Sequence, residues 1–125
     1  NPVATACGLA TLKLIQQGGF FEQLSARTRQ LMGGFVKVAA DAGVPLTADS
    51  EGGMFGFFFA SELPQNYQQV MARGTDTFNR FFHLMLDQGV YLAPAMYEAG
   101  FVSAAHTDQD IADTVAAAAQ AFRRL

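Results

Sequence analysis

The sequence holds few side chains capable of nucleophilic or acid–base chemistry, and they lie far apart along the chain. There are two histidines, His83 and His106, and one cysteine, Cys7. His83 lies beside a stripe of phenylalanines at helical spacing, and no base is close to Cys7 in the sequence. Because a nucleophile needs a neighbouring base to act at neutral pH, these three residues are expected to serve packing or to lie at the surface.

Two short patterns look like binding motifs but lack the residues that the chemistry needs. Gly52-Gly53-Met54 is not a phosphate loop, because no lysine follows at the required spacing and no helix begins directly after it. Asp108, Asp110 and Asp113 are close together, but at an expected helix start they favour capping and dipole interactions over metal binding. We therefore expect no metal site.

Glu98 is the acidic residue with the most unusual surroundings. Between Gly89 and Thr107 it is the only acidic or basic residue apart from His106, and its neighbours are mostly apolar or aromatic. Such a carboxylate is either a solvated loop residue or a charge kept for a function. A buried, unpaired carboxylate is costly, so the functional interpretation requires a cation that this chain does not supply nearby.

Helices are predicted wherever apolar residues recur at intervals of three and four. Local signals also mark the helix ends: Asn1-Pro2 suits a helix start, Gly43 and Gly89 suit helix ends, and Thr107 with Asp110 resembles a capping box. The predicted helices are Pro2–Gln17, Leu24–Ala42, Asn66–Ala72, one that Thr75 caps and Gly89 ends, and a last one that Thr107 opens. Gly33-Gly34, inside the second helix, predicts close packing or a bend.

Four short strands are predicted between these helices. They are Leu46–Ser50, Met54–Phe59, Val90–Leu92 and Gly100–Ala104, with Glu51-Gly52-Gly53 as the turn between the first two. The nearly continuous apolar run of the second strand suggests that it is covered on both faces. Because strands and helices are grouped rather than strictly alternating, we expect an α+β fold, with a short, mostly antiparallel sheet and helices on one face.

The composition excludes several classes of protein. Eight Lys and Arg against eleven Asp and Glu, without a basic block, argue against a nucleic-acid partner. No apolar run approaches the roughly 20 residues of a membrane-spanning helix. Cys7 has no partner for an internal disulfide, which fits a reducing compartment such as the cytoplasm. Twelve phenylalanines and only 15% charged residues indicate more apolar surface than a self-contained domain needs.

Five segments, in order along the whole chain, resemble one family. The segments are Asn1–Ala4, Gly52–Phe58, Arg80–His83, Asp87–Pro94, and Glu98–Phe101 followed by Ala105–Thr107. Together they are similar to the glutamate-1-semialdehyde 2,1-aminomutases, in the class-III branch of the pyridoxal-phosphate aminotransferases. Ala95 stands where members of this family often have serine, which affects only a local hydrogen bond.

This resemblance implies that the chain is the C-terminal portion of a homodimeric, cytoplasmic enzyme. Residues 1–18 would be a helix leading from a missing large domain, and residues 19–125 the small domain of a type-I pyridoxal-phosphate enzyme. The cofactor lysine and most phosphate contacts would lie upstream, since Lys13 and Lys37 do not stand in the family's cofactor-lysine context. This fragment is therefore expected to hold no cofactor and to be inactive alone. Glu98 matches the active-site glutamate that faces cofactor and substrate.

The reaction that the resemblance implies is an intramolecular exchange of an amino group and a carbonyl, which gives 5-aminolevulinate for tetrapyrrole synthesis. Ordinary class-III transaminases use an arginine in this region to bind a substrate carboxylate, and no arginine occurs between Arg80 and Arg123. Two alternatives remain: another class-III transaminase, or a stand-alone interaction module that uses the surplus of apolar surface.

Overall fold

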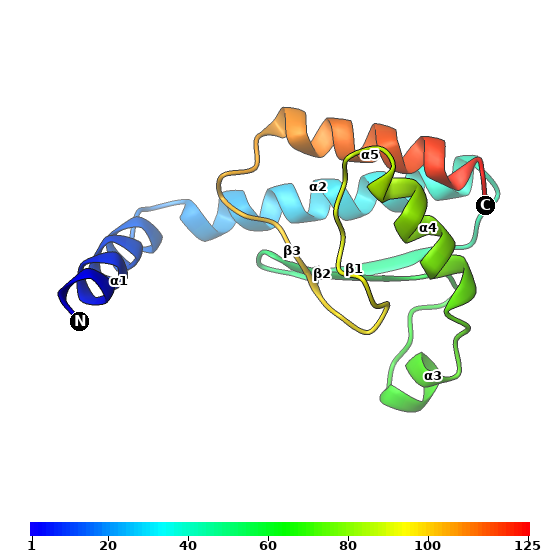
Figure 1. Cartoon of the computed structure of the whole chain (residues 1–125), viewed down its shortest axis with the longest axis horizontal. Helices are drawn as coiled ribbons and strands as arrows, with labels where there is room; N and C mark the ends of the chain where they lie inside the picture. The colour runs from blue at the N-terminus through cyan, green and yellow to red at the C-terminus, as the bar shows by residue number, and fades with distance from the viewer.

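The structure is a computed structural model that describes residues 1–125. Three strands form one antiparallel sheet in the order β1-β2-β3, and helices α2 and α5 lie over one face of it (Figure 1). The elements are α1 (Pro2–Ile15), α2 (Phe20–Asp41), β1 (Thr47–Glu51), β2 (Met54–Phe58), α3 (Tyr67–Met71), α4 (Asp76–Leu86), β3 (Gly100–Phe101) and α5 (Asp108–Phe122). The predicted α+β class, with its small antiparallel sheet, is confirmed.

Local capping determines where most helices begin. The Asn1 side chain accepts a hydrogen bond from the Val3 N–H at 3.0 Å, and Thr107 and Asp110 form the predicted capping box at the start of α5. The prediction for Thr75 is wrong in part. Thr75 occupies the N-cap of α4, but its backbone is already helical (φ −91°, ψ −14°), so its side chain makes no capping hydrogen bond. A capping side chain needs the extended backbone that Thr107 has.

The β1–β2 hairpin forms as predicted around Gly52, which adopts a positive φ of 58°. The expectation that β2 is covered on both faces is not met within this chain. Phe55 and Phe57 are buried against the helices, whereas Met54 on the other face is 45% exposed and Phe58 is only half-buried. The reason is the period of two along a strand: the core helices cover one face, and the other borders an open groove.

The predicted strand Val90–Leu92 is wrong. Val90 instead donates its N–H to the Met85 carbonyl at 3.0 Å, in the turn that Gly89 makes at the end of α4. Its apolar side chains pack against the core without a strand to pair with. β3 is also shorter than predicted and ends at Phe101, because the chain turns between Ser103 and His106.

Aromatic rings fill the space between the helices and the sheet. Phe35, Phe81 and Phe122 are almost completely buried, and the rings of Phe81 and Phe122 stack with centroids 4.6 Å apart. The close packing predicted at Gly33-Gly34 occurs at Gly34, where a Cβ would come within 2.5 Å of Val115 Cγ2 on α5. Part of the phenylalanine surplus is therefore core, and the small residue on α2 lets α5 approach closely.

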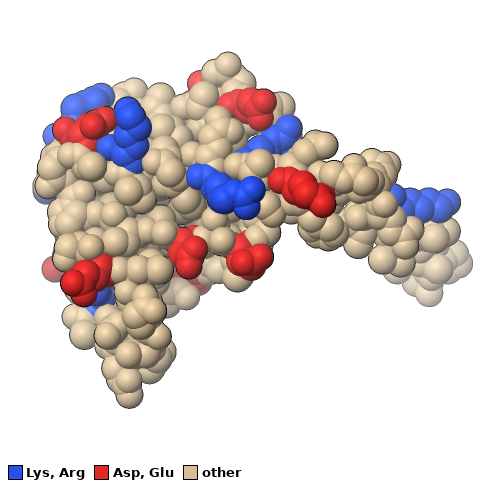
Figure 2. Space-filling view, turned by 180° about the vertical axis from the view of Figure 1, so that it is seen from behind, with Lys and Arg blue, Asp and Glu red and all other residues tan.

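Helix α1 extends away from this core, as Figure 1 shows, and has no buried residue. Its large apolar side chains are exposed; they are Val3, Leu9, Leu12 and Leu14. In Figure 2 the surfaces of both projecting parts, α1 and α3, are almost free of charged groups. No helix of the chain is at once long and apolar enough to cross a membrane.

Candidate functional site

Glu98 lies in the loop that leads into β3. Its backbone N–H donates to the Ala95 carbonyl at 3.1 Å, and the neighbouring Met96 is only 8% exposed, so the loop is anchored in the core on one side of Glu98. The Glu98 side chain is exposed and takes part in neither of the two ion pairs of the chain. A fixed backbone therefore presents a carboxylate that has no partner within these residues.

On its other side, Glu98 is held by the pairing of β3 with β2. Gly100 pairs with Phe55, and the absence of a side chain at Gly100 is required there, since a Cβ would lie 2.2 Å from the Phe55 ring. The next hydrogen bond runs from the Val102 N–H to the Gly53 carbonyl at 2.8 Å. The strand that follows Glu98 therefore lies close against the hairpin turn.

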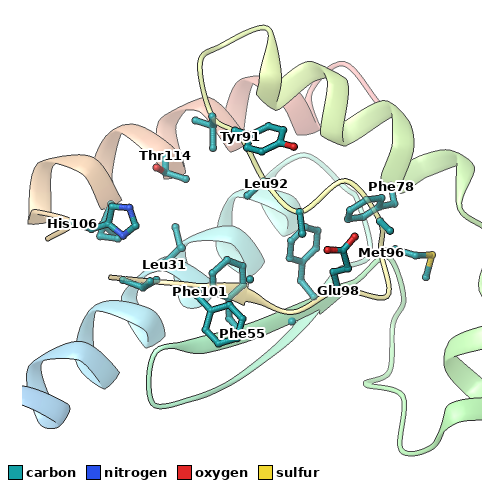
Figure 3. Close-up of a pocket in the computed structure, with 18 of the residues that line it drawn as sticks. Leu31, Phe55, Phe78, Tyr91, Leu92, Met96, Glu98, Phe101, His106 and Thr114 are labelled. Atoms are coloured by element: carbon teal, nitrogen blue, oxygen red, sulfur yellow. The ribbon is translucent and has the colours of Figure 1, made fainter. Parts of the chain in front are cut away.

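Glu98 borders two cavities. The first has a volume of about 170 Å³ and lies between β2, the segment from Val90 to Val102, and the start of α5 (Figure 3). Its lining is mostly apolar, with a few polar side chains, namely Tyr91, Glu98, His106, Asp110 and Thr114. Figure 3 shows Glu98 and His106 toward opposite ends of it.

The second cavity, which we call the acidic groove, has a volume of about 680 Å³ and lies on the open face of the hairpin, next to α3. Its apolar walls include Met54, Phe58 and Val70. Its charged residues are Asp49, Glu51 and Glu98, and no lysine, arginine or histidine is among its lining residues. A groove with carboxylates as its only charges attracts cations and disfavours anions, so it suits an ammonium group and not a phosphate.

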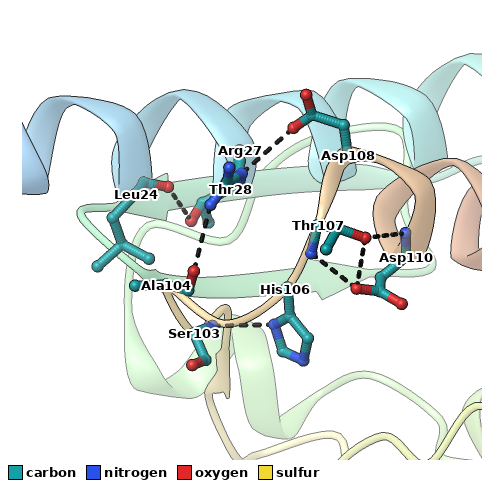
Figure 4. A network of polar contacts seen from close by, with 9 residues as sticks. All are labelled: Leu24, Arg27, Thr28, Ser103, Ala104, His106, Thr107, Asp108 and Asp110. Carbon is teal, nitrogen blue, oxygen red and sulfur yellow. Dashed lines mark hydrogen bonds and ion pairs between the residues drawn. The ribbon is translucent and has the colours of Figure 1, made fainter.

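Of the three aspartates near residue 110, Asp110 has the capping role that the sequence predicts, and Figure 4 shows its contacts with Thr107. Asp108 forms an ion pair with Arg27 at 3.2 Å, and Asp113 accepts from the Gln109 side chain at 2.8 Å. Hydrogen bonds from the backbone and then the side chain of Thr107 lower the pKa of the Asp110 carboxyl. No group of three metal-binding side chains converges anywhere in the structure.

The other candidate residues are not brought to Glu98. Cys7 is exposed on α1 and His83 is exposed on α4. Lys13 lies on α1, and Lys37 pairs with Asp41 at 3.5 Å on α2. None of these four residues lines either cavity. His106 lines the first cavity, at the end opposite Glu98 in Figure 3.

Comparison with known proteins gives a consistent result. No protein-family model matches the chain. The glutamate-1-semialdehyde 2,1-aminomutase of Polaromonas naphthalenivorans is 66% identical over 122 residues, which are 98% of this chain and 28% of that protein. The aminomutase of Leptothrix cholodnii is 65% identical over 127 residues, covering 98% and 29% respectively. Over nearly its whole length, the chain is therefore similar to glutamate-1-semialdehyde 2,1-aminomutases. It spans about 28% of the length of the curated relatives that it matches.

Solved structures also resemble this chain in fold. An ω-transaminase from Sphaerobacter thermophilus superposes with a TM-score of 0.85 at 22% identity, covering 98% of this chain and 28% of that one. A transaminase with pyridoxal phosphate bound gives 0.76 at 20% identity, covering 99% and 27%. The fold is therefore that of a small α+β part of such transaminases. The family resemblance predicted from five segments is confirmed, and neither alternative function is favoured.

Three features of this site were not predicted from the sequence. Asp49 and Glu51 were assigned only to a strand and a turn, and their place beside Glu98 depends on the hairpin folding next to the loop. His106 was assigned to packing or the surface; it is exposed, but it also makes a specific hydrogen bond. The sequence gives one indication that His106 belongs near the site: it lies close to Glu98 in a stretch that is otherwise uncharged.

Proposed function

We propose that this chain is part of a glutamate-1-semialdehyde 2,1-aminomutase and that the whole protein isomerises glutamate-1-semialdehyde to 5-aminolevulinate for tetrapyrrole synthesis. The observation that carries this proposal is the 66% identity to an aminomutase across 98% of the chain. The cofactor of the whole protein would be pyridoxal phosphate, which is bound in one of the transaminases that share this fold. The expected location of the enzyme is the cytoplasm.

The residues of this chain do not fit a complete pyridoxal-phosphate site. Covalent attachment needs a lysine and the phosphate needs cations or backbone N–H groups, but neither lysine reaches Glu98, and the acidic groove carries only negative charge. The residues of the acidic groove instead fit the part of an active site that binds the amino group of a substrate. The part of the enzyme that anchors the cofactor is therefore assigned to residues outside this chain.

Glu98 is the residue of this chain that we assign to the active site. Its carboxylate has no partner here, and an ammonium group of the substrate would supply the cation that an apolar loop lacks. Once water is excluded, attraction between a carboxylate and an ammonium is stronger than in bulk solvent. Glu98 would thus hold the substrate's amino group in place while the exchange proceeds, with Asp49 and Glu51 adding attraction for the cation.

We assign the exposed apolar surfaces to contacts within the whole enzyme. Residues 1–18, including α1, would contact the large domain, residues 19–125 would form the small domain, and a second subunit would complete a homodimer. This assignment rests on the exposed leucines of α1 and on the apolar wall of the acidic groove. Contiguous exposed apolar surface of this kind marks protein interfaces.

The test uses the full-length enzyme with a single amino-acid substrate. Formation of 5-aminolevulinate from glutamate-1-semialdehyde, without a separate amino donor or acceptor, is the expected result. A strict requirement for a second substrate would contradict the proposal, because it would make the protein an ordinary transaminase.

The role of Glu98 is tested by Glu98→Gln in the same enzyme. The amide keeps the size of the side chain and removes its charge, so we expect kcat to fall by about 10²-fold, as for loss of one preorganised electrostatic contact. The midpoint of thermal unfolding should not change. Glu62→Gln is the matched control, since Glu62 is exposed and lines neither cavity. Unchanged turnover in Glu98→Gln would remove Glu98 from the site.

A further inference from the structure

His106 makes a hydrogen bond that an ordinary surface histidine does not need. Its Nδ1 accepts from the Ser103 backbone N–H at 2.9 Å, which turns the ring back onto its own chain (Figure 4). A hydrogen bond of this kind uses the lone pair of Nδ1. The imidazole therefore acts here as an acceptor for one particular amide.

This hydrogen bond closes a tight turn directly after β3. Within the turn, the His106 N–H donates to the Ser103 carbonyl at 3.1 Å, and the Ala105 N–H donates to Ser103 Oγ at 3.1 Å. From α2, Arg27 donates to the Ala104 carbonyl at 3.3 Å and pairs with Asp108. The turn from Ser103 to His106 is thus the point where the segment carrying Glu98 is attached to α2 and α5.

The attachment matters because β3 alone holds this segment weakly. β3 consists of two residues, Gly100 and Phe101, and one further backbone hydrogen bond, from Val102 to Gly53, follows it. Glu98 lies two positions before this short strand and His106 lies after it, and both line the cavity of about 170 Å³ (Figure 3). A change in the turn would therefore change the direction of the strand that follows Glu98.

We propose that His106 is a positioning residue for Glu98. By accepting the Ser103 N–H at Nδ1, it fixes the turn after β3 and so fixes where the Glu98 carboxylate points. This inference rests on the proposed role of Glu98 in the active site. His106 itself transfers no proton and contacts no reacting atom in this assignment.

The test compares two amide substitutions in the full-length enzyme. His106→Asn places an amide oxygen near the position of Nδ1 and can still accept the Ser103 N–H, whereas His106→Gln places its amide near Nε2. Loss of a neutral hydrogen bond that orients a reacting group corresponds to a fall in kcat of about three- to tenfold. We expect this fall in His106→Gln and a kcat within about twofold of wild type in His106→Asn. His83→Asn and His83→Gln are matched controls, since His83 is exposed and its side chain makes no hydrogen bond.

A double variant separates positioning from a general structural role. If His106 acts only through Glu98, then Glu98→Gln combined with His106→Gln should be no slower than Glu98→Gln alone. Losses that multiply in the double variant would overturn the inference, and so would equal kcat values in His106→Asn and His106→Gln. Wild-type turnover in Glu98→Gln would instead refute the proposed role of Glu98, so the two failures are distinguishable.

Discussion

At the scale of single residues, Asp110 caps the start of α5 and also carries a negative charge there. Asp110 accepts the Thr107 N–H and the Thr107 hydroxyl, both at 2.7 Å, and these bonds lower the pKa of its carboxyl. A group whose pKa is lower in the folded state stabilises the protein above the pKa of the unfolded chain. That contribution disappears as the pH falls through the folded-state pKa.

Asp110→Ala should therefore destabilise α5 at neutral pH, and its difference from wild type should shrink as the pH falls below the usual carboxyl pKa of about 3.9. Amide hydrogen exchange in the first turns of α5, measured in the full-length enzyme at several pH values, checks this. Asp113→Ala is the control, since Asp113 lies on the same helix but outside the capping box. A difference that stays constant with pH would mean that the Asp110 charge contributes nothing.

The candidate site could be only partly predicted from single residues. Glu98 stood out because it is an isolated charge in an apolar stretch, which is a property of the sequence alone. The acidic groove needs Asp49 and Glu51 from a hairpin more than 40 positions earlier in the chain, as the residue numbers show. Local patterns carry no information on such a contact, because it forms only when the sheet does.

At the scale of elements, the crossing of α2 and α5 depends on a single missing side chain. Gly34 stands where a Cβ would meet Val115 Cγ2 at 2.5 Å, whereas Gly33 next to it has open space. Alanine stabilises a helix by about 1 kcal/mol relative to glycine. A substitution to alanine can gain this stability at Gly33, whereas at Gly34 the clash with Val115 opposes it.

We expect Gly33→Ala to stabilise α2 by about 0.5–1 kcal/mol through helix propensity. Gly34→Ala should instead destabilise by about 1–3 kcal/mol, because Val115 is β-branched and cannot easily move its methyl groups away. Hydrogen exchange of α2 and α5 amides in the full-length enzyme measures both effects. Adding Val115→Ala to Gly34→Ala should recover part of the loss. If Gly34→Ala is as stable as Gly33→Ala, the two helices are not in close contact there.

The elements that the sequence predicts correctly are those with local determinants. Helix caps at Asn1 and Thr107, and the turn at Gly52, depend on residues within a few positions of one another. The strand predicted at Val90–Leu92 was wrong because its apolar residues meet the core through side chains, without a neighbouring strand to pair with. A strand forms only where a neighbouring strand has free backbone groups to pair with. A short apolar run in the sequence does not show whether such a neighbour is present.

At the scale of the whole molecule, this chain has much exposed apolar surface and spans only part of its relatives' length. The chain covers about 28% of a matching aminomutase, and α1 has no buried residue. Its one charged residue is Lys13, and its leucines are exposed. Exposing these leucines to water is unfavourable, because burying one leucine side chain stabilises a protein by about 1.5–3 kcal/mol. The large domain proposed above would cover this surface.

Cys7 reports directly on that coverage, because it lies on α1 and its thiol is exposed in this chain. We expect an alkylating reagent to modify Cys7 at least about tenfold more slowly in the folded full-length enzyme than in the isolated 125-residue chain, since local opening must precede reaction at a covered site. Peptide mapping by mass spectrometry assigns the modification to Cys7 even if the full-length protein contains other cysteines. The denatured full-length enzyme is the control and should react at the rate of the isolated chain. Equal rates in the folded enzyme and the isolated chain would mean that α1 remains in solvent, and the large domain would then have to contact another face of this chain.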